Sequence, residues 1–117
     1  MTDMTYTRLG NSGLIVSRMC FGTMTFNLGS DWLPGVASVG QDDATKMVEK
    51  ALDAGVNFFD TADGYSNGES EQILGRALGK RRNAAVICTK LGFRQTDQIN
   101  DAGLSRSHVT KQSDGSL

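Results

Sequence analysis

An acid, a phenol and an amine occur in the central part of the sequence, as Asp60, Tyr65 and Lys90. A phenol has a pKa of about 10, so a tyrosine that donates a proton near neutrality needs help. A nearby lysine ammonium stabilises the phenolate and lowers that pKa, and a carboxylate hydrogen-bonded to the lysine holds it in place. Such a trio suits general acid catalysis, in which a carbonyl oxygen is protonated while hydride arrives at its carbon.

The predicted elements around these residues bring them to one edge of a sheet. Short apolar runs predict three buried strands, at residues 19–22, 56–59 and 84–89. Asp60 follows the second strand, Tyr65 lies in the loop after it, and Lys90 follows the third strand. In parallel α/β architectures, ligand sites gather at the carboxyl ends of the strands. The spacing therefore predicts that the three side chains share one rim of the sheet.

Two helices are predicted between the strands, because apolar residues recur there at three- and four-residue spacing. Strands that are apolar throughout and alternate with helices predict a parallel sheet covered by helices. The expected end signals are Asp42 or Asp43 and then Gly55 for the first helix, Ser70 and then Gly79 for the second, and Ser105 for the start of a third.

The chain before the first buried strand is predicted to be a β-hairpin, and the chain after it a long loop. Residues 6–16 contain a Gly-Asn-Ser-Gly turn signal between short strand-like stretches. Residues 23–40 are rich in glycine and contain the only proline, Pro34. A loop of this length in a compact domain is usually functional or mobile.

Each candidate residue has a plainer interpretation when it is taken alone. An aspartate such as Asp60 is more often a turn or cap residue, and a loop tyrosine such as Tyr65 more often packs with a hydrogen-bonded tip. A lysine after a strand, as at Lys90, is usually a solvated edge charge. Their joint placement is what favours a site. His108, the only histidine, lies at the predicted start of the third helix and is expected to be a surface or capping residue with no catalytic part.

The composition excludes several other functions. A net charge of -1 gives neither a basic field for nucleic acid nor a polybasic membrane patch. No apolar run approaches the roughly 18 residues that a membrane span needs. Cys20 and Cys88 lie in short apolar runs and are predicted to be buried, reduced thiols, and no Cys/His pattern predicts a metal site. Residues 1–10 contain no apolar secretory segment, so the cytoplasm is the expected compartment.

The length of 117 residues allows one domain or a piece of a larger one. A TIM barrel repeats the strand–helix unit eight times over roughly 250 residues, and this chain stops in the third repeat. An open, doubly wound sheet of three strands fits the length better. Length alone therefore favours the open sheet.

Around these residues the sequence resembles the aldo-keto reductase superfamily. The stretch FFDTADGYSNGESE, with LGRAL shortly after it, is similar to the longest signature of that superfamily. The similarity covers nearly the whole chain in the expected order, with the character of the bacterial branch that also resembles the potassium-channel β-subunits. Shorter matching segments lie at residues 6–10, 16–17, 20–24, 89–90 and 103–106.

The resemblance implies the N-terminal portion of a (β/α)8 TIM barrel preceded by a β-hairpin, with about three βα units in one incomplete domain, residues 1–117. It implies an NADPH-dependent oxidoreductase that reduces aldehydes or ketones to alcohols without a metal. Tyr65 would be the general acid, tuned by Lys90 and Asp60. The cofactor would lie near Asp60 and near Gly22, Thr23 and Met24, and the loop at 23–40 would border the substrate pocket.

Two parts of that family's pattern are missing from this sequence. Its fourth catalytic residue is a histidine after the fourth strand, a position that His108 does not occupy. The segments that grip the phosphates and adenine of the cofactor come from later strands. The chain is therefore expected to be a truncated barrel that is inactive by itself. The alternative is a nucleotide-binding regulatory subunit similar to the channel β-subunits, with little turnover.

Overall fold

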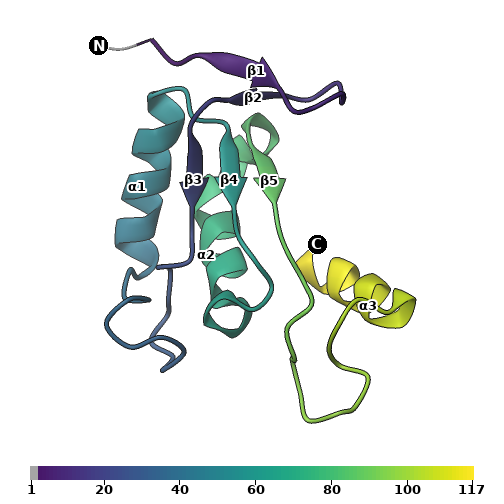
Figure 1. Ribbon diagram of the computed structural model, residues 1–117. Coiled ribbons are helices and arrows are strands. Elements are labelled where there is room, and N and C mark those ends of the chain that lie inside the picture. The colour runs from purple at the N-terminus through teal and green to yellow at the C-terminus, as the bar shows by residue number, and fades with distance from the viewer. Residues whose placement is uncertain (1–2) are drawn as a thin grey trace.

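An antiparallel hairpin comes first in the computed structural model, which describes residues 3–117 (Figure 1). Strand β1 (Tyr6–Arg8) pairs with β2 (Ile15–Ser17), and the Leu9 amide donates to the Leu14 carbonyl at 2.9 Å to close the turn. Gly10 has a φ of 57°, a left-handed conformation that glycine adopts without steric cost. The predicted hairpin is confirmed.

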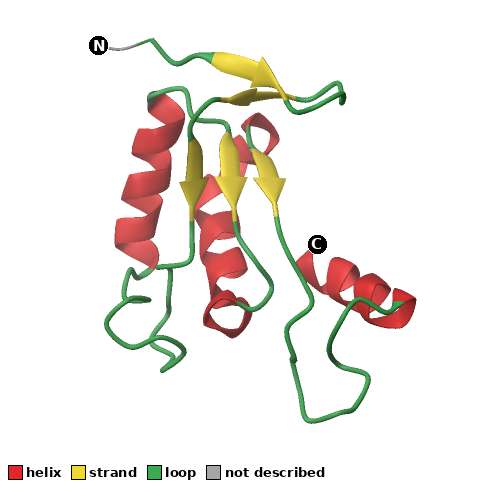
Figure 2. Ribbon diagram, in the orientation of Figure 1, coloured by secondary structure: helices red, strands yellow, loops and turns green. Residues whose placement is uncertain are grey.

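The main sheet is parallel and has the order β3-β4-β5, with strands β3 (Cys20–Gly22), β4 (Phe58–Asp60) and β5 (Val86–Cys88). All three strands point the same way, so their carboxyl ends meet at one edge, the lower one in Figure 2. Each strand is shorter than its predicted run. Asp60 is the last residue of β4, whereas Lys90 lies two positions beyond β5.

Helices α1 (Gln41–Asp53) and α2 (Glu69–Leu78) pack against each other and cover one face of this sheet (Figure 1). Alternate residues along a strand point to opposite faces, and Phe59 of β4 faces the helices with no exposed surface. It lies in the core with residues of both helices, and the Phe21 ring of β3 packs on it at 5.8 Å. Helix α3 (Arg106–Ser116) follows the long segment after β5.

The opposite face of the sheet is uncovered by any helix of residues 3–117, and this placement corrects one prediction. Cys20 and Cys88, which were predicted to be buried, are exposed because they occupy the rows of β3 and β5 that point away from the helices. An apolar run in a sequence does not tell which face of a strand is covered. A doubly wound sheet has helices on both faces, whereas a βα barrel has them only on the outside. Helices that cover only one face of the sheet therefore indicate a section of a barrel.

Two of the predicted helix caps are wrong. Helix α1 begins after Gly40, so Asp42 and Asp43 lie in its first turn, where a carboxylate complements the helix dipole. Helix α2 begins after Gly68, which adopts a φ of 94°, and Ser70 lies buried inside the first turn. The other expected end signals are confirmed, at Gly55, Gly79 and Ser105.

Residues 23–40 form the predicted loop, tied down by one β-bridge between Phe26 and Val39. Phe26 is fully buried in the core, so the loop is anchored near its start. None of the helices within residues 3–117 has the length and apolar character that crossing a membrane would require.

Candidate active site

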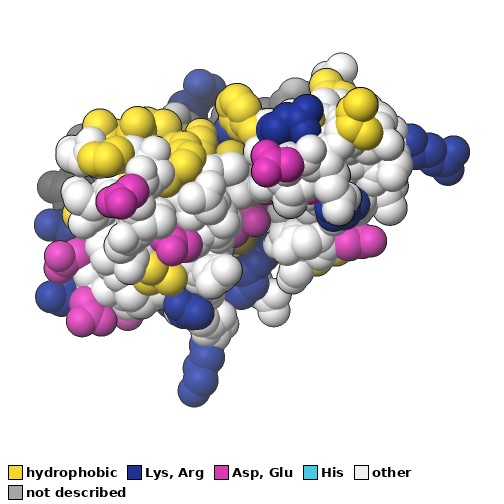
Figure 3. All heavy atoms as spheres, turned by 90° about the horizontal axis from the view of Figure 1, so that it is seen from below, with side chains coloured by type: hydrophobic (Ala, Val, Ile, Leu, Met, Phe, Trp, Pro, Cys, Tyr) yellow, Lys and Arg dark blue, Asp and Glu magenta, His cyan; other side chains and the backbone are white. Residues whose placement is uncertain are grey.

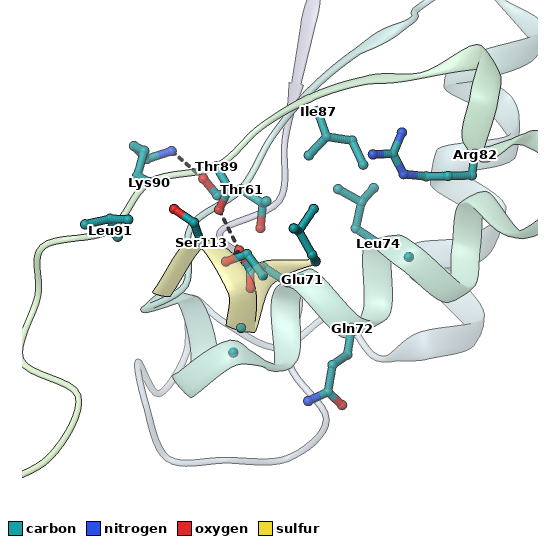
Figure 4. Close-up of a pocket in the computed structure, with 15 residues that line it drawn as sticks. Thr61, Glu71, Gln72, Leu74, Arg82, Ile87, Thr89, Lys90, Leu91 and Ser113 are labelled. Carbon is teal, nitrogen blue, oxygen red and sulfur yellow. Dashed lines mark hydrogen bonds between the residues drawn. The ribbon is translucent and has the colours of Figure 1, made fainter. Parts of the chain in front are cut away.

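Asp60 and Lys90 meet at the carboxyl edge of the sheet, as the sequence predicts. The Lys90 ammonium donates to both carboxylate oxygens of Asp60, at 2.9 and 2.8 Å, and to the Thr61 carbonyl at 2.6 Å. These three acceptors match the three protons of an ammonium group. Figure 4 shows Lys90 pointing toward Thr61. The lysine is therefore held in one orientation by the last residue of β4 and the residue that follows it.

The charge of Lys90 is stabilised where it lies. Partial burial works to lower the pKa of Lys90, but the interactions with Asp60 and then with Tyr65 outweigh it and raise this pKa above the ordinary value of 10.5. The net rise means that the ammonium stays protonated throughout the neutral range. A fixed positive charge is thus present beside the phenol.

Tyr65 opens a short 3-10 segment, Tyr65–Gly68, that leads into α2. The Lys90 Nζ atom lies over its ring, 5.0 Å from the centroid, so the third predicted residue joins the other two. The Trp32 ring, from the loop at 23–40, packs against the Tyr65 ring, with the two ring centroids 5.9 Å apart. Trp32 was not among the residues predicted for the site. Its signal was an isolated large aromatic residue within a glycine-rich loop.

The predicted cofactor residues lie at the same edge but in different environments. Gly22 pairs with Asp60 in the sheet, and it is exposed, as is Met24. Thr23 is fully buried, and both its amide and its hydroxyl donate to the Asp60 carbonyl at 3.0 Å. Its side chain therefore holds β3 to β4. The roles of these residues toward a cofactor stay predictions.

The edge on which the strands end is partly apolar. Figure 3 views this edge and shows hydrophobic side chains gathered at the upper left, on the side where the loop at 23–40 lies in Figure 1. That loop contributes four exposed large hydrophobic residues, namely Met24, Leu28, Leu33 and Val36. The same loop carries Trp32, whose ring packs against that of Tyr65.

A separate cavity of about 740 Å³ lies between α2, the end of β5 and the C-terminal end of α3 (Figure 4). Glu71 lines it and accepts hydrogen bonds from the hydroxyls of Thr89 and Ser116, at 2.6 and 2.9 Å. Lys90 touches one end of the cavity, but Asp60 and Tyr65 do not line it. The cavity is therefore distinct from the edge where the trio meets.

The prediction of a surface position for His108 is wrong. The backbone amide of His108 does donate to the Ser105 hydroxyl at 3.1 Å, as a helix start requires, but the side chain is only 1% exposed. Its Nδ1 atom lies 3.6 Å from the carboxylate of buried Asp101, which also accepts from Lys111 at 2.6 Å. Asp101 lies in the loop segment before α3, and no pattern in the sequence around His108 predicts this contact.

Asp63, next to the trio, carries an unfavourable charge. Burial, with a further contribution from Glu71, raises the pKa of Asp63, and the Gly64 backbone and His108 offset only part of this rise. A folded-state pKa above the unfolded value means that protonation favours folding. The stabilisation that comes from protonating Asp63 is present in full at a pH below the ordinary pKa of 3.8. It is lost as the pH rises through the raised pKa of the folded state.

Asp63→Asn is therefore expected to raise the free energy of unfolding near pH 7. The gain should be roughly 0.5 to 1 kcal/mol, because solvent screens part of the charge penalty. It should shrink as the pH falls into the range where the carboxyl group is protonated. Urea denaturation at pH 7 and pH 4 measures both, with exposed Asp31→Asn as the control. An equal gain at both pH values would contradict the role of the charge.

The fold and the site together place the chain among βα-barrel proteins. Residues 18–117 match the aldo/keto reductase family, and the chain belongs to this family. The match confirms the resemblance in the sequence and the barrel interpretation over the open sheet that length alone favours.

The chain spans about a third of the length of the curated relatives it matches. A "Probable voltage-gated potassium channel subunit beta" of Oryza sativa subsp. japonica is 40% identical over an alignment of 117 positions, gaps included, which covers 97% of this chain and 33% of that protein. The versiconal hemiacetal acetate reductase of Aspergillus parasiticus is 35% identical over an alignment of 134 positions, gaps included, which covers 97% of this chain and 38% of that protein. The solved holo form of the aldo-keto reductase AKR11C1 from Bacillus halodurans superposes with a TM-score of 0.75 at 32% identity, covering 97% of this chain and 35% of that one.

Proposed function

We propose that Tyr65, Lys90 and Asp60 form the proton-transfer site of an NADPH-dependent reductase of aldehydes or ketones. The observation that carries this proposal is the contact of one ammonium with both other members. Lys90 Nζ lies 2.8 Å from an Asp60 oxygen and 5.0 Å from the centre of the Tyr65 ring. A cytoplasmic location and a small carbonyl substrate belong to the same proposal.

The chemistry assigned to these residues is a proton transfer. Tyr65 donates its phenolic proton to the carbonyl oxygen of the substrate, which becomes the alcohol oxygen. The Lys90 ammonium stabilises the phenolate that remains, and Asp60 fixes that ammonium by accepting from it with both oxygens. Bound NADPH supplies the hydride that reaches the carbonyl carbon.

Open space over the end of β3 supports the placement of the cofactor beside the trio. A side chain added at Gly22 would meet no atom within 4 Å, so the space over the end of β3 is open. Gly22, Met24 and Asp60 would border the reacting end of the cofactor there, while buried Thr23 holds the strand ends together.

Residues 1–117 alone are proposed to be inactive. The strands β3 and β5 each have one side that pairs with no strand of residues 3–117, and one face of the sheet lacks a covering layer in the same part of the chain. Open edges and exposed apolar surface favour association over a single folded state. Residues 1–117 are therefore expected to show no saturable quenching of NADPH fluorescence. A cooperative thermal transition that shifts upward with NADPH would overturn this part of the proposal.

The activity is tested on the protein expressed from its complete coding sequence. It is expected to consume NADPH, followed at 340 nm, when small aldehydes or ketones are added, and to consume NADH more slowly. Stopped-flow measurement of NADPH binding beside turnover separates this function from a regulatory subunit. Tight binding without turnover across a panel of aldehydes and ketones would favour the regulatory subunit and contradict the reductase.

A further inference from the structure

We infer that Ser66 and Ser70 are positioning residues that hold Tyr65 and Asp60 in place by pinning each of them to the turn after β3. The two serines lie one helical turn apart in sequence, and both side chains are fully buried. Each hydroxyl donates at 2.7 Å to a backbone carbonyl of the segment 23–26. The inference rests on the proposed function, because it assigns supporting residues to the same site.

Ser70 belongs to a connected set of three buried hydroxyl groups. Each hydroxyl has one proton to donate, which limits how the bonds can be arranged. Thr23 donates to the Asp60 carbonyl at 3.0 Å, and Ser70 donates to the Thr23 carbonyl at 2.7 Å. The Ser70 oxygen is then free to accept from the Thr61 hydroxyl, 3.4 Å away. In this arrangement one hydroxyl of α2 ties the end of β3 to the end of β4.

The end of β4 is the part of the backbone that orients Lys90. All three acceptors of the ammonium come from two consecutive residues, the Asp60 carboxylate and the Thr61 carbonyl. On the other side, the Asp60 carbonyl accepts from Thr23, and the Thr61 hydroxyl lies 3.4 Å from the Ser70 hydroxyl. Loss of the Ser70 hydroxyl therefore loosens the platform on which the ammonium is held. Ser70 touches none of the reacting groups, so it acts through its neighbours.

Ser66 fixes the loop that carries Tyr65. Ser66 and Asn67 have φ values of 49° and 55°, in the left-handed region that side chains other than glycine rarely adopt. Such a backbone conformation persists only where surrounding contacts stabilise it, and the hydrogen bond from the Ser66 hydroxyl to the Phe26 carbonyl is one such contact. Phe26 itself is fixed in the core. The residue directly after the proposed acid is thus anchored to a residue of the loop at 23–40 that is buried in the core.

A purely structural role is the competing explanation, because any buried hydroxyl with partners contributes to stability. Ser17 provides a matched control for it. It is also buried, it donates to the Met19 carbonyl at 2.6 Å, and it accepts from the Asn57 amide at 3.2 Å. Its bonds lie at the opposite, amino-terminal end of the sheet. Ser17→Ala removes a comparable set of bonds away from the site.

The test compares Ser66→Ala, Ser70→Ala and Ser17→Ala in the protein expressed from its complete coding sequence. Both variants of the inferred positioning residues are expected to lower kcat about tenfold with KM nearly unchanged, since small displacements of catalytic groups reduce rates steeply. NMR titration of the Lys90 side chain, without cofactor or substrate, reports the Asp60 contact. Ser70→Ala is expected to move the Lys90 midpoint toward that of a free lysine. Ser66→Ala should shift that midpoint less than Ser70→Ala, because Tyr65 raises the Lys90 pKa less than Asp60 does. Ser17→Ala should leave it unchanged.

The inference is overturned if Ser70→Ala leaves the Lys90 midpoint in place, or if the three variants lower kcat to the same extent. Ser70→Cys preserves the packing volume with a weaker donor, and it should give an intermediate shift if Ser70→Ala does not fold. The Lys90 titration needs no turnover. It can therefore support the positioning role even where the reductase proposal fails. An active reductase whose Lys90 midpoint does not respond to Ser70→Ala would instead support the reductase proposal and overturn the positioning role.

Discussion

Tyr65→Phe is expected to lower kcat for carbonyl reduction by about 10²- to 10⁴-fold, the range for loss of a general acid. The substitution removes only the hydroxyl group. The ring remains in contact with the Lys90 ammonium, 5.0 Å from its centroid, and with the Trp32 ring at 5.9 Å. The fold and the binding of NADPH are therefore expected to stay close to those of the unaltered protein. Steady-state kinetics with a small aldehyde, beside fluorescence titration of NADPH, measure both.

The other tyrosine of the chain gives the matched control. The Tyr6 hydroxyl donates to the Gly55 carbonyl at 2.7 Å, at the amino-terminal side of the molecule. Tyr6→Phe thus removes a hydrogen-bonded phenol without touching the trio, and kcat should stay within about twofold of the unaltered value. Comparable rates for the two variants would remove Tyr65 from the role of acid.

The site was largely visible in the sequence because strand ends can be predicted. Asp60 and Lys90 follow apolar runs, and parallel strands bring their carboxyl ends to one edge, so their contact follows from topology. The resemblance to the family then assigned the roles. The approach of Tyr65 to the ammonium needed the loop geometry, in which two left-handed residues turn the chain into α2.

Other features depend on contacts that no local pattern contains. His108 is buried by residues of the segment before α3, and Cys20 and Cys88 are exposed because helices cover only the other face. Ser70 has the residue type of a cap, but Gly68 takes that position, and the serine turns inward to Thr23. In each case a residue with a familiar surface or core preference is placed by contacts that lie outside its own helix or strand.

Lys90→Met is expected to lower kcat by about 10²- to 10³-fold, as loss of one fixed electrostatic stabiliser does. Methionine keeps much of the length of the side chain, so the loss is mainly that of charge. The effect on stability should be small. The side chains of Lys90 and Asp60 are 46% and 35% exposed, and ion pairs of this exposure contribute little to folding. Arg81→Met, which breaks an exposed pair with Asp53 of the same 2.8 Å length, should change neither activity nor stability appreciably.

Asp60→Asn tests how the carboxylate acts through the lysine. Burial lowers the pKa of Lys90, and Asp60 is the main group that raises it, so removing the carboxylate charge lowers this pKa. The ammonium is then lost at a lower pH than in the unaltered protein. The alkaline limb of the plot of kcat against pH should shift downward accordingly. In the double variant with Lys90→Met, kcat should fall by the same factor as in Lys90→Met alone, because Asp60 then has no ammonium left to position. Additive losses would show instead that Asp60 acts on the reaction independently of Lys90.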